Sequence, residues 1–320
     1  MEPMIDILMA TYNGERFVKQ QIDSILAQTL PVRLIMRDDG STDATLAILQ
    51  EYAQKYSAQI TLLPTESRLG IKGNFSKLME ASSAPYIMLC DQDDVWDKEK
   101  AADTLAHLHK MEAQYGKEKP LLVHTDLNVV DRDLHLLHPS FWKYTKLYPE
   151  KALTLNRLLV QNAITGCATM FNRPLLRKAL PIPEECIMHD WWLGLVASTF
   201  GAIGFLNKST IQYRQHGSNN LGAQKFSWAN LVRKGMRLFK EIPQKKAFYD
   251  KNTLQARAFK GRYQSDLTPE QQKILDMYLT LDQQSFPHDL YLTFKHKFCK
   301  QCKARNAGLI LWKILNRLPI

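Results

Sequence analysis

The amino-terminal third of the chain alternates short apolar segments with polar turns and helical segments. Residues 5–10 and 33–37 have the length and apolar character of buried strands. Each is followed by a polar turn and then by a segment of helical periodicity, near residues 15–28 and 44–56. Strand, turn and helix repeated in this order are typical of a parallel sheet with right-handed crossovers. The chain is therefore expected to be an α/β protein with both polar turns at one edge of the sheet.

A third apolar segment, residues 84–90, ends in an acidic string. The string reads Asp91-Gln92-Asp93-Asp94. Ligands of open α/β sheets bind beyond the carboxyl ends of the strands. Closely spaced carboxylates suit a hard divalent ion such as Mg²⁺ or Mn²⁺, which keeps positions open for substrate phosphates. An acidic turn that caps the next helix is the alternative. The position after a buried strand favours a metal site.

Two further strings carry side chains that suit chemistry on a phosphate-linked substrate. The string His189-Asp190-Trp191-Trp192 offers a carboxylate able to act as a base, beside two indoles able to stack on a sugar ring. The string Tyr213-Arg214-Gln215-His216 supplies a histidine able to complete a metal shell. Each has a plainer alternative. Asp190 can cap a helix, the indoles can be core residues, and His216 can be an ordinary histidine at a strand end.

Taken together, these strings resemble the inverting nucleotide-sugar glycosyltransferases of family 2, over about residues 4–217. The residues that carry the resemblance are Thr11-Tyr12-Asn13-Gly14, Asp38-Asp39-Gly40-Ser41-Thr42-Asp43, Asp91-Gln92-Asp93-Asp94, His189-Asp190 and Gln215-His216. The resemblance implies the GT-A fold, a Rossmann-like and mostly parallel sheet flanked by helices. Three longer strings, at residues 90–96, 189–192 and 213–217, are most similar to bacterial rhamnosyltransferases that build cell-surface polysaccharides.

The resemblance assigns the nucleotide-binding residues one at a time. Thr11 and Tyr12 match the loop around the nucleoside, and Asp39 matches the acid that reads the base edge. Asp91 matches the first acid of the family's D-x-D motif, near the donor ribose or sugar. Lys72 is a candidate for neutralising the diphosphate, although a loop lysine is ordinarily a solvated one. Because no G-x-G-x-x-G motif is present, a dinucleotide cofactor is not expected.

The remaining assignments concern metal and base. Asp93 matches the second acid of the motif, which contacts the metal, and His216 matches a histidine that completes the metal shell or contacts the diphosphate. Asp190 matches the general base. The chain departs from the family pattern at His189, where glutamate is commoner. The expected cofactor is therefore Mg²⁺ or Mn²⁺.

Contacts to the sugar or the acceptor are expected at two places. Trp191 and Trp192 flank the base, and a small-residue loop at residues 161–168 includes Thr165 and Gly166, where the family places acceptor contacts. The same loop can equally be a tight turn into a strand.

These residues predict a metal-dependent transfer with inversion, since one base faces the leaving group across the sugar. The resemblance to the rhamnosyltransferases implies dTDP-L-rhamnose as the donor, and the expected acceptor is a lipid-linked saccharide in cell-surface polysaccharide synthesis. A UDP-hexose or UDP-N-acetylhexosamine would be served equally by the same metal and base. A sugar-1-phosphate nucleotidyltransferase is disfavoured because the first turn lacks a Gly-rich, basic triphosphate loop.

Positive charge is concentrated in the carboxyl-terminal part. Residues 225–320 hold 19 lysines and arginines against 7 acidic residues, so they supply all of the net charge of +10. We expect a GT-A catalytic domain at residues 1–220 and a basic helical region at residues 221–320. Residues 228–241 and 308–318 interleave apolar and basic side chains, as in helices on an anionic membrane surface. The alternatives are a helical subdomain packed on the core and a non-catalytic basic protein that binds membrane or nucleic acid. No nucleic-acid-binding motif is evident, so no nucleic acid is expected as a partner.

The chain is expected to act in the cytoplasm, peripherally on the inner face of the cell membrane. Its start lacks the pattern of a signal peptide. The five cysteines form no framework of pairs, which favours reduced thiols. The longest uncharged run, residues 191–206, is too short for a spanning helix.

Overall fold

The computed structural model describes residues 4–217, 238–315 and 317, which form two compact units. The first unit contains residues 4–141, 164–182 and 200–217. The second contains residues 142–163 and 183–199 together with the described residues from 238 onward. Two segments that precede residue 200 therefore group with the carboxyl-terminal helices. The sequence-based division between residues 220 and 221 stays a prediction.

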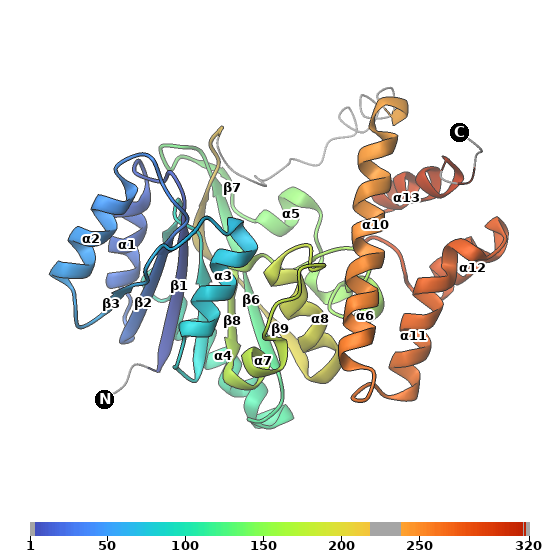
Figure 1. The fold of residues 1–320 in the computed structure, drawn as a ribbon, viewed down its shortest axis with the longest axis horizontal. Coiled ribbons are helices and arrows are strands. Elements are labelled where there is room, and N and C mark those ends of the chain that lie inside the picture. The colour runs from blue at the N-terminus through green and yellow to red at the C-terminus, as the bar shows by residue number, and fades with distance from the viewer. Residues whose placement is uncertain (1–3, 218–237, 316, 318–320) are drawn as a thin grey trace. The chain divides into compact units, whose positions relative to one another are not determined.

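A mixed sheet organises the first unit (Figure 1). Across the sheet the strands are β3 (Ile60–Leu62), β2 (Val32–Asp38), β1 (Ile5–Thr11), β4 (Tyr86–Cys90), β8 (Thr169–Asn172), β6 (Leu121–Val130), β9 (Ala202–Arg214) and β5 (Val95–Trp96), and β7 (Leu136–His138) pairs with β6. The first four of these run parallel, and β2, β1 and β4 among them correspond to the three strands that the sequence predicts. The strand β8 is antiparallel to both β4 and β6, whereas β9 is parallel to β6.

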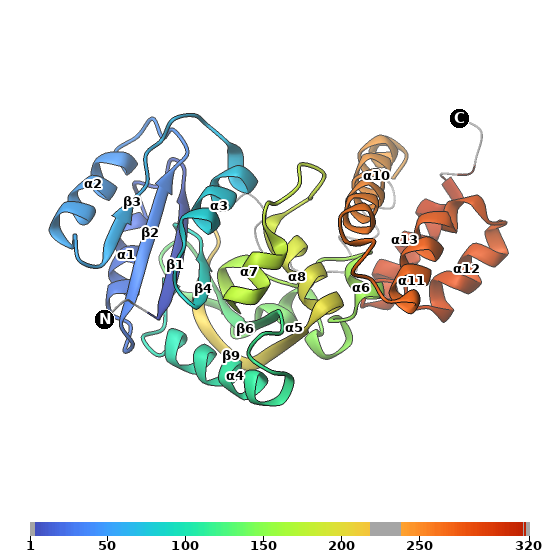
Figure 2. The ribbon, with the colours of Figure 1, turned by 60° about the horizontal axis from the view of Figure 1, so that its bottom comes forward.

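Helices cover both faces of the sheet because its central strands are apolar on both faces. The helices of this unit are α1 (Val18–Leu26), α2 (Thr45–Lys55), α3 (Gly70–Ala81), α4 (Lys100–Tyr115) and α7 (Arg173–Ala179). Alternate residues of β1, Ile5, Ile7 and Met9, share one core cluster with α1 and α4. Leu8 lies on the other face and is fully buried there, where α3 contacts β1 and β2. Figure 2 shows α3 on the opposite side of β1 from α1 and α2.

The second unit is helical. Its helices are α5 (Phe141–Thr145), α6 (Leu155–Leu158), α8 (His189–Phe200), α10 (Leu238–Tyr263), α11 (Pro269–Thr280), α12 (Phe286–Lys295) and α13 (Lys303–Leu315). Thr268 and Gln271 form a capping box at the amino terminus of α11. The carboxylate of Asp289 in α12 is fully buried and pairs with Lys313 of α13 at 2.7 Å and with Arg317 at 2.8 Å.

Two sequence expectations concern membranes. Residues 228–237 of the first expected membrane-surface helix lie outside the described residues. The second expected segment, residues 308–318, falls largely within α13. In the part of the chain that the structure describes, no helix combines the length and the apolar character needed to cross a bilayer. All five cysteines are free thiols.

Candidate functional site

The ends of β1, β2 and β4 bring three polar segments to one edge of the sheet. The strands run parallel, and Thr11 of β1 lies opposite Asp38 of β2. Gln92 joins the first turn to the acidic string, because its amide accepts the N–H of Tyr12 at 2.9 Å and donates to the carbonyl of Tyr12 at 3.0 Å. A Cβ at Gly14 would lie 2.3 Å from Oε1 of Gln92, so a side chain there would displace the Gln92 amide.

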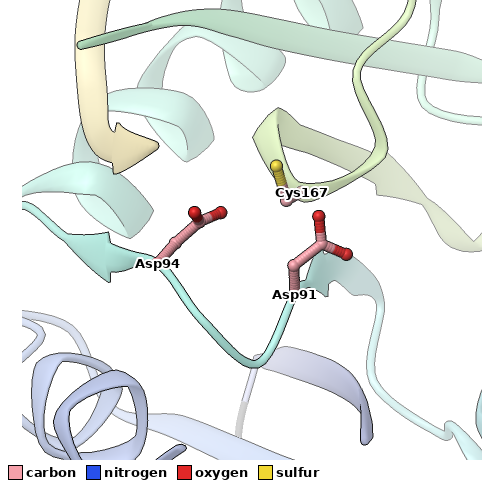
Figure 3. A group of neighbouring side chains, drawn as sticks. All are labelled: Asp91, Asp94 and Cys167. Atoms are coloured by element: carbon pink, nitrogen blue, oxygen red, sulfur yellow. The ribbon is translucent and has the colours of Figure 1, made fainter. Parts of the chain in front are cut away.

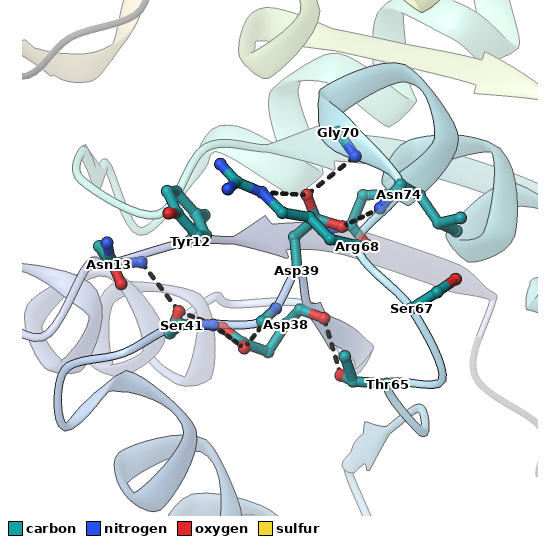
Figure 4. A network of polar contacts seen from close by, with 12 residues as sticks. Tyr12, Asn13, Asp38, Asp39, Ser41, Thr65, Ser67, Arg68, Gly70 and Asn74 are labelled. Carbon is teal, nitrogen blue, oxygen red and sulfur yellow. Dashed lines mark hydrogen bonds and ion pairs between the residues drawn. The ribbon is translucent and has the colours of Figure 1, made fainter.

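Asp38 holds the second polar turn. Its Oδ1 accepts the hydroxyl protons of Thr11 and Ser41, and its Oδ2 accepts the N–H groups of Gly40 at 3.0 Å and Ser41 at 2.7 Å. Figure 4 shows Ser41 bonded to Asp38. These bonds support a left-handed backbone at Gly40, where φ is +83°. Thr11 is only 2% exposed. Its hydroxyl therefore shapes the nucleoside loop expected from the sequence by binding Asp38.

Asp39 begins α3. Its Oδ1 accepts the N–H of Leu69 at 2.7 Å and its Oδ2 accepts the N–H of Gly70 at 2.9 Å. Leu69 offers no side-chain cap, so the carboxylate satisfies N–H groups that the helix leaves open and also lies favourably in the helix dipole. Arg37, which is nearly buried, approaches Oδ1 at 3.5 Å. Because a carboxylate offers about four acceptor positions, Asp39 can support α3 and still accept a further N–H.

Arg68 lies between Asp39 and Tyr12. The centre of its guanidinium is 4.1 Å from the centroid of the Tyr12 ring, and its Nε is 4.0 Å from Oδ2 of Asp39 (Figure 4). Both Arg68 and Tyr12 are exposed. Arg68 therefore lies over the ring of Tyr12, a residue that the sequence places in the loop around the nucleoside.

Asp93 and His216, the two residues expected to hold the metal, contact each other. Oδ2 of Asp93 is 2.8 Å from Nε2 of His216, and each side chain is about 15% exposed. Phe17 packs on the imidazole with the ring centroids 4.7 Å apart. Two ligand atoms, each about 2.1 Å from one ion and at right angles, are about 3 Å apart. The pair forms a hydrogen bond, and the same spacing also fits neighbouring ligands of one divalent ion, for which the carboxylate suits Mg²⁺ or Mn²⁺.

Arg214 positions the acidic string from the end of β9. Its backbone N–H donates to Oδ1 of Asp94 at 3.0 Å, and its Nε donates to the carbonyl of Asp93 at 2.7 Å. Its Nη2 donates to Gln20 at 2.6 Å, and the guanidinium lies over the ring of Phe17 at 4.6 Å. Arg214 is 3% exposed. It is a scaffold residue for Asp93 and His216.

Asp91, Asp94 and Cys167 form a second group of potential metal ligands, with ligand atoms within 4.8 Å of one another (Figure 3). Burial, followed by the charges of Asp93 and Asp91, raises the pKa of the Asp94 carboxyl well above its ordinary value. Burial likewise raises the pKa of the Cys167 thiol. A protonated thiol is a poor ligand, and sulfur does not suit Mg²⁺ or Mn²⁺. This group fits a hard ion less well than Asp93 and His216 do.

The other contacts expected in the first unit lie on α3 and before β8. Lys72 lies in the first turn of α3 and is half-buried. Thr165 precedes a short 3-10 turn, Gly166–Ala168, which leads directly into β8. The hydroxyl of Thr169 donates to the carbonyl of Gly166 at 2.7 Å. The tight turn into a strand is thus present, and it brings Cys167 to Asp91 and Asp94.

Asp190 belongs to the second unit and lies in the first turn of α8. Its Oδ1 accepts the Nδ2 of Asn162 at 3.1 Å and the N–H of Trp191 at 2.6 Å, and the residue is 9% exposed. A carboxylate here is favoured by the helix dipole. Burial lowers the pKa of the neighbouring His189 to about 3, so its ring is neutral near pH 7.

The two indoles beside Asp190 are buried. Trp191 is 3% exposed and its Nε1 donates to the carbonyl of Leu158. Trp192 is completely buried against Phe259 and Tyr263 of α10, with ring centroids 5.4 and 6.0 Å away. Trp192 is thus a core residue of the second unit, which is the plainer of the two possibilities that the sequence offered.

A family model described as glycosyl transferase family 2 matches residues 6–180, which is more than half of the chain. The chain belongs to glycosyltransferase family 2. Its similar sequences include the dTDP-rhamnosyl transferase RfbG of Shigella flexneri, 28% identical over 228 residues, covering 67% of this chain and 74% of that protein. An uncharacterized protein of Mycobacterium tuberculosis is 26% identical over 218 residues, covering 66% of this chain. That match spans only 59% of the relative's length.

Solved structures place this family 2 chain in a known fold. TarS residues 1–349 of Staphylococcus aureus, in complex with UDP, matches with a TM-score of 0.56 and 15% identity, covering 91% of this chain and 72% of that one. The mannosyltransferase PcManGT of Pyrobaculum calidifontis, in complex with GDP-Man and Mn²⁺, matches with a TM-score of 0.51 and 14% identity, covering 98% and 86%. At these identities the likeness concerns the fold alone. It confirms the expected GT-A class.

Sequence reasoning on this family 2 chain missed several residues that organise the site. Gln92, between two acids of the string, clamps the loop of Tyr12. Arg214 was noted only as part of a string, and Asn162 only as part of a loop. The signal for Gln92 is its place inside the acidic string. Arg214 and Asn162 carry no comparable signal, because their partners lie 120 and 28 residues away.

Proposed function

We propose that this chain transfers a sugar from a nucleotide-diphosphate donor to an acceptor hydroxyl, with inversion at the anomeric carbon. The observation that carries the proposal is the contact of Asp93 with His216, 2.8 Å apart. It lies at the sheet edge that also presents Tyr12 and Asp39. Membership of glycosyltransferase family 2 supports the reaction class.

The first unit binds the donor. Tyr12 packs on the base, and Asp39 accepts the imide N–H of uracil or thymine through the acceptor position that α3 leaves open. Asp91 lies near the ribose or the sugar, and Lys72 neutralises a phosphate. Arg68, already over Tyr12 and beside Asp39, either moves aside or covers the base as it enters.

Asp93 and His216 hold the metal in this proposal. When bound there, a divalent ion supplies Lewis-acid stabilisation of the negative charge on the departing diphosphate. Arg214 keeps the acidic string in place through the carbonyl of Asp93 and the carboxylate of Asp94.

Asp190 is the proposed general base. The acceptor oxygen forms a bond to the anomeric carbon, the bond from that carbon to the diphosphate oxygen breaks, and the proton of the acceptor hydroxyl passes to a carboxylate oxygen of Asp190. Asn162 donates to Oδ1 and keeps the carboxylate oriented. General-base assistance of this kind typically contributes about 10²–10⁴-fold.

The proposed donor is dTDP-L-rhamnose and the proposed acceptor is a lipid-linked saccharide. The similarity to the Shigella dTDP-rhamnosyl transferase and the three longer strings support the sugar. The excess of basic residues after position 224 supports an acceptor presented at an anionic membrane surface.

A panel of nucleotide sugars tests the donor. With Mn²⁺ present, dTDP-L-rhamnose should raise the thermal unfolding midpoint more than dTDP, UDP-glucose or UDP-N-acetylglucosamine at equal concentration, because a ligand bound only by the folded state stabilises it. A larger shift of the midpoint with a UDP-sugar would show that the donor is not dTDP-L-rhamnose, while the proposed glycosyltransferase activity would still stand. No shift with any nucleotide sugar would remove the proposed donor site.

A further inference from the structure

Gln92 is the one uncharged residue of the acidic string, and its side chain binds the first polar turn. Its Oε1 accepts the backbone N–H of Tyr12 at 2.9 Å, and its Nε2 donates to the backbone carbonyl of Tyr12 at 3.0 Å. A side-chain amide carries a donor and an acceptor, so one amide satisfies both backbone groups of Tyr12. The two residues are 80 apart in the sequence. The contact therefore joins the loop after β1 to the segment after β4.

The absence of a side chain at Gly14 leaves room for this amide. A Cβ at Gly14 would lie 2.3 Å from Oε1 of Gln92 and 2.5 Å from its Cδ. Both distances are far shorter than van der Waals contact, so a methyl group and the amide cannot occupy these positions together. The φ of Gly14 lies outside the left-handed region, so glycine is required here for space and not for its backbone conformation.

The second polar turn binds the residue that follows Tyr12. The N–H of Asn13 donates to Oγ of Ser41 at 2.8 Å, and Oδ1 of Asn13 accepts the N–H of Thr42 at 2.8 Å (Figure 4). These bonds fix Asn13 and do not include Tyr12. Among the described residues, Gln92 supplies both hydrogen bonds to the backbone of Tyr12. The conformation of the Tyr12 backbone therefore depends on the Gln92 amide.

The ring of Tyr12 has little packing of its own to hold it. It is 36% exposed, and the guanidinium of Arg68 that lies over it is exposed as well. The direction of such a ring is set mainly by the backbone that carries it. A binding group that is held in place before the ligand arrives saves the entropy cost of ordering it on binding. Two hydrogen bonds to the Tyr12 backbone can therefore increase the affinity for a base that packs on the ring.

We propose that Gln92 is a positioning residue for the nucleobase of the donor. Its amide holds the backbone of Tyr12 so that the ring presents one face to the base. The inference rests on the proposed donor site, and it gives Gln92 a role different from those of Asp91 and Asp93 on either side. Because Gln92 acts on the base through Tyr12, its loss should weaken the binding of a nucleoside diphosphate and leave the binding of pyrophosphate unchanged.

Calorimetry on the full chain with Mg²⁺ compares dTDP and UDP with inorganic pyrophosphate, which has no base. Gln92→Ala removes both hydrogen bonds and should weaken the binding of the nucleotides by about tenfold. The affinity for pyrophosphate should stay within about twofold, which also shows that the variant is folded. Gln54→Ala, the same change on an exposed residue of α2, should alter neither affinity.

Gly14→Ala tests the same contact from the opposite side. The added methyl group should displace the Gln92 amide and weaken the binding of dTDP by about tenfold as well. In the double variant Gly14→Ala/Gln92→Ala the amide that the methyl group would displace is already gone. The combined loss should therefore stay near tenfold, whereas independent effects would multiply to about a hundredfold. A hundredfold loss would contradict the proposal.

Two further outcomes would overturn the role of Gln92 while the donor site stands. Unchanged affinity of Gln92→Ala for dTDP and UDP would show that the amide does not act on the base. Equal weakening of nucleotide and pyrophosphate binding would show that Gln92 supports the acidic string instead of Tyr12. If the unmodified chain binds neither dTDP nor UDP, the proposed donor site itself is wrong, and this inference falls with it.

Discussion

At the scale of single residues, most carboxylates of the sheet edge bind backbone N–H groups. Asp38 supports the turn at Gly40, and Asp39 caps the amino terminus of α3. Asp93 differs, because its Oδ2 contacts the side chain of His216 at 2.8 Å. The contact joins two segments that are 123 residues apart in the sequence.

The variant Asp93→Asn tests this contact. The amide keeps the size of the side chain but is a weaker metal ligand, so turnover should fall by more than about 10²-fold, since the metal contributes several kcal/mol to the barrier. Electron paramagnetic resonance of added Mn²⁺ should show weaker binding as well. Glu51→Gln, the same chemical change on an exposed residue of α2, should alter neither measurement. Full turnover of the unmodified chain in EDTA would contradict the metal-dependent mechanism.

Two buried histidines make stability depend on pH. Burial lowers the pKa of His124 and of His189 to about 3, against about 6.5 in an unfolded chain. Between these values the unfolded chain binds protons that the folded chain does not, so each histidine lowers stability as the pH falls below 6.5. From pH 7 to pH 5 the loss should be about 2 kcal/mol per histidine. Urea unfolding of His124→Gln should show a loss smaller by that amount, and an unchanged pH dependence would contradict the burial of a neutral His124.

At the scale of secondary-structure elements, local patterns predicted the strands well. The segments expected at residues 5–10, 33–37 and 84–90 correspond to β1, β2 and β4 within about two residues at each end. Apolar runs between polar turns produce this signal wherever they occur. The antiparallel placement of β8 between β4 and β6 carries no local signal, because it depends on pairings between distant segments.

The candidate site likewise contains residues that local motifs identify and others whose roles depend on distant segments. Asp93 and His216 could be named because motifs mark them, and the structure brings them together. The capping of α3 by Asp39 could not be predicted from the sequence. Its partners are the backbone N–H groups of Leu69 and Gly70, which lie about 30 residues away and whose side chains give no signal of the contact. The burial of Trp192 depends on α10, which follows far later in the chain.

Two glycine-to-alanine variants test the helix assignments, because they should change the free energy of unfolding in opposite directions. Gly308 lies inside α13, is exposed, and a Cβ there meets nothing within 4 Å. Gly308→Ala should therefore stabilise the chain by about 0.5–1 kcal/mol. Gly116 ends α4 with φ at +95°, so Gly116→Ala should destabilise by about 1–2 kcal/mol. Urea unfolding measures both changes, and a destabilising Gly308→Ala would contradict a regular α13.

At the scale of the whole molecule, positive charge and secondary structure are unevenly distributed. The sheet and the proposed donor residues belong to the first unit, whereas Asp190 and the carboxyl-terminal helices belong to the second. Residues 142–163 and 183–199 contribute to the second unit, so its fold requires segments from three parts of the chain. The proposed base and the basic helices therefore share one structural unit.

Membrane association should follow from the basic residues after position 224. Full-length protein should sediment with vesicles that contain anionic lipid at low salt, and less so as salt is raised, because each lysine or arginine near the surface contributes about 1 kcal/mol that salt screens. Neutral vesicles serve as the control. Equal sedimentation with neutral and anionic vesicles, or none with either, would remove the proposed surface role.

The release of nucleoside diphosphate tests the central proposal most directly. The full chain is incubated with dTDP-L-rhamnose, Mn²⁺ and a bacterial lipid extract as acceptor, and the unmodified chain is compared with Asp190→Asn. Asparagine keeps the Oδ1 that accepts from Asn162 and Trp191, so α8 should remain intact. Release should require Mn²⁺ and fall by about 10²-fold or more in the variant, while donor affinity stays nearly unchanged. Full release by Asp190→Asn, or a collapse of donor affinity with turnover retained, would contradict Asp190 as the base of an inverting transfer.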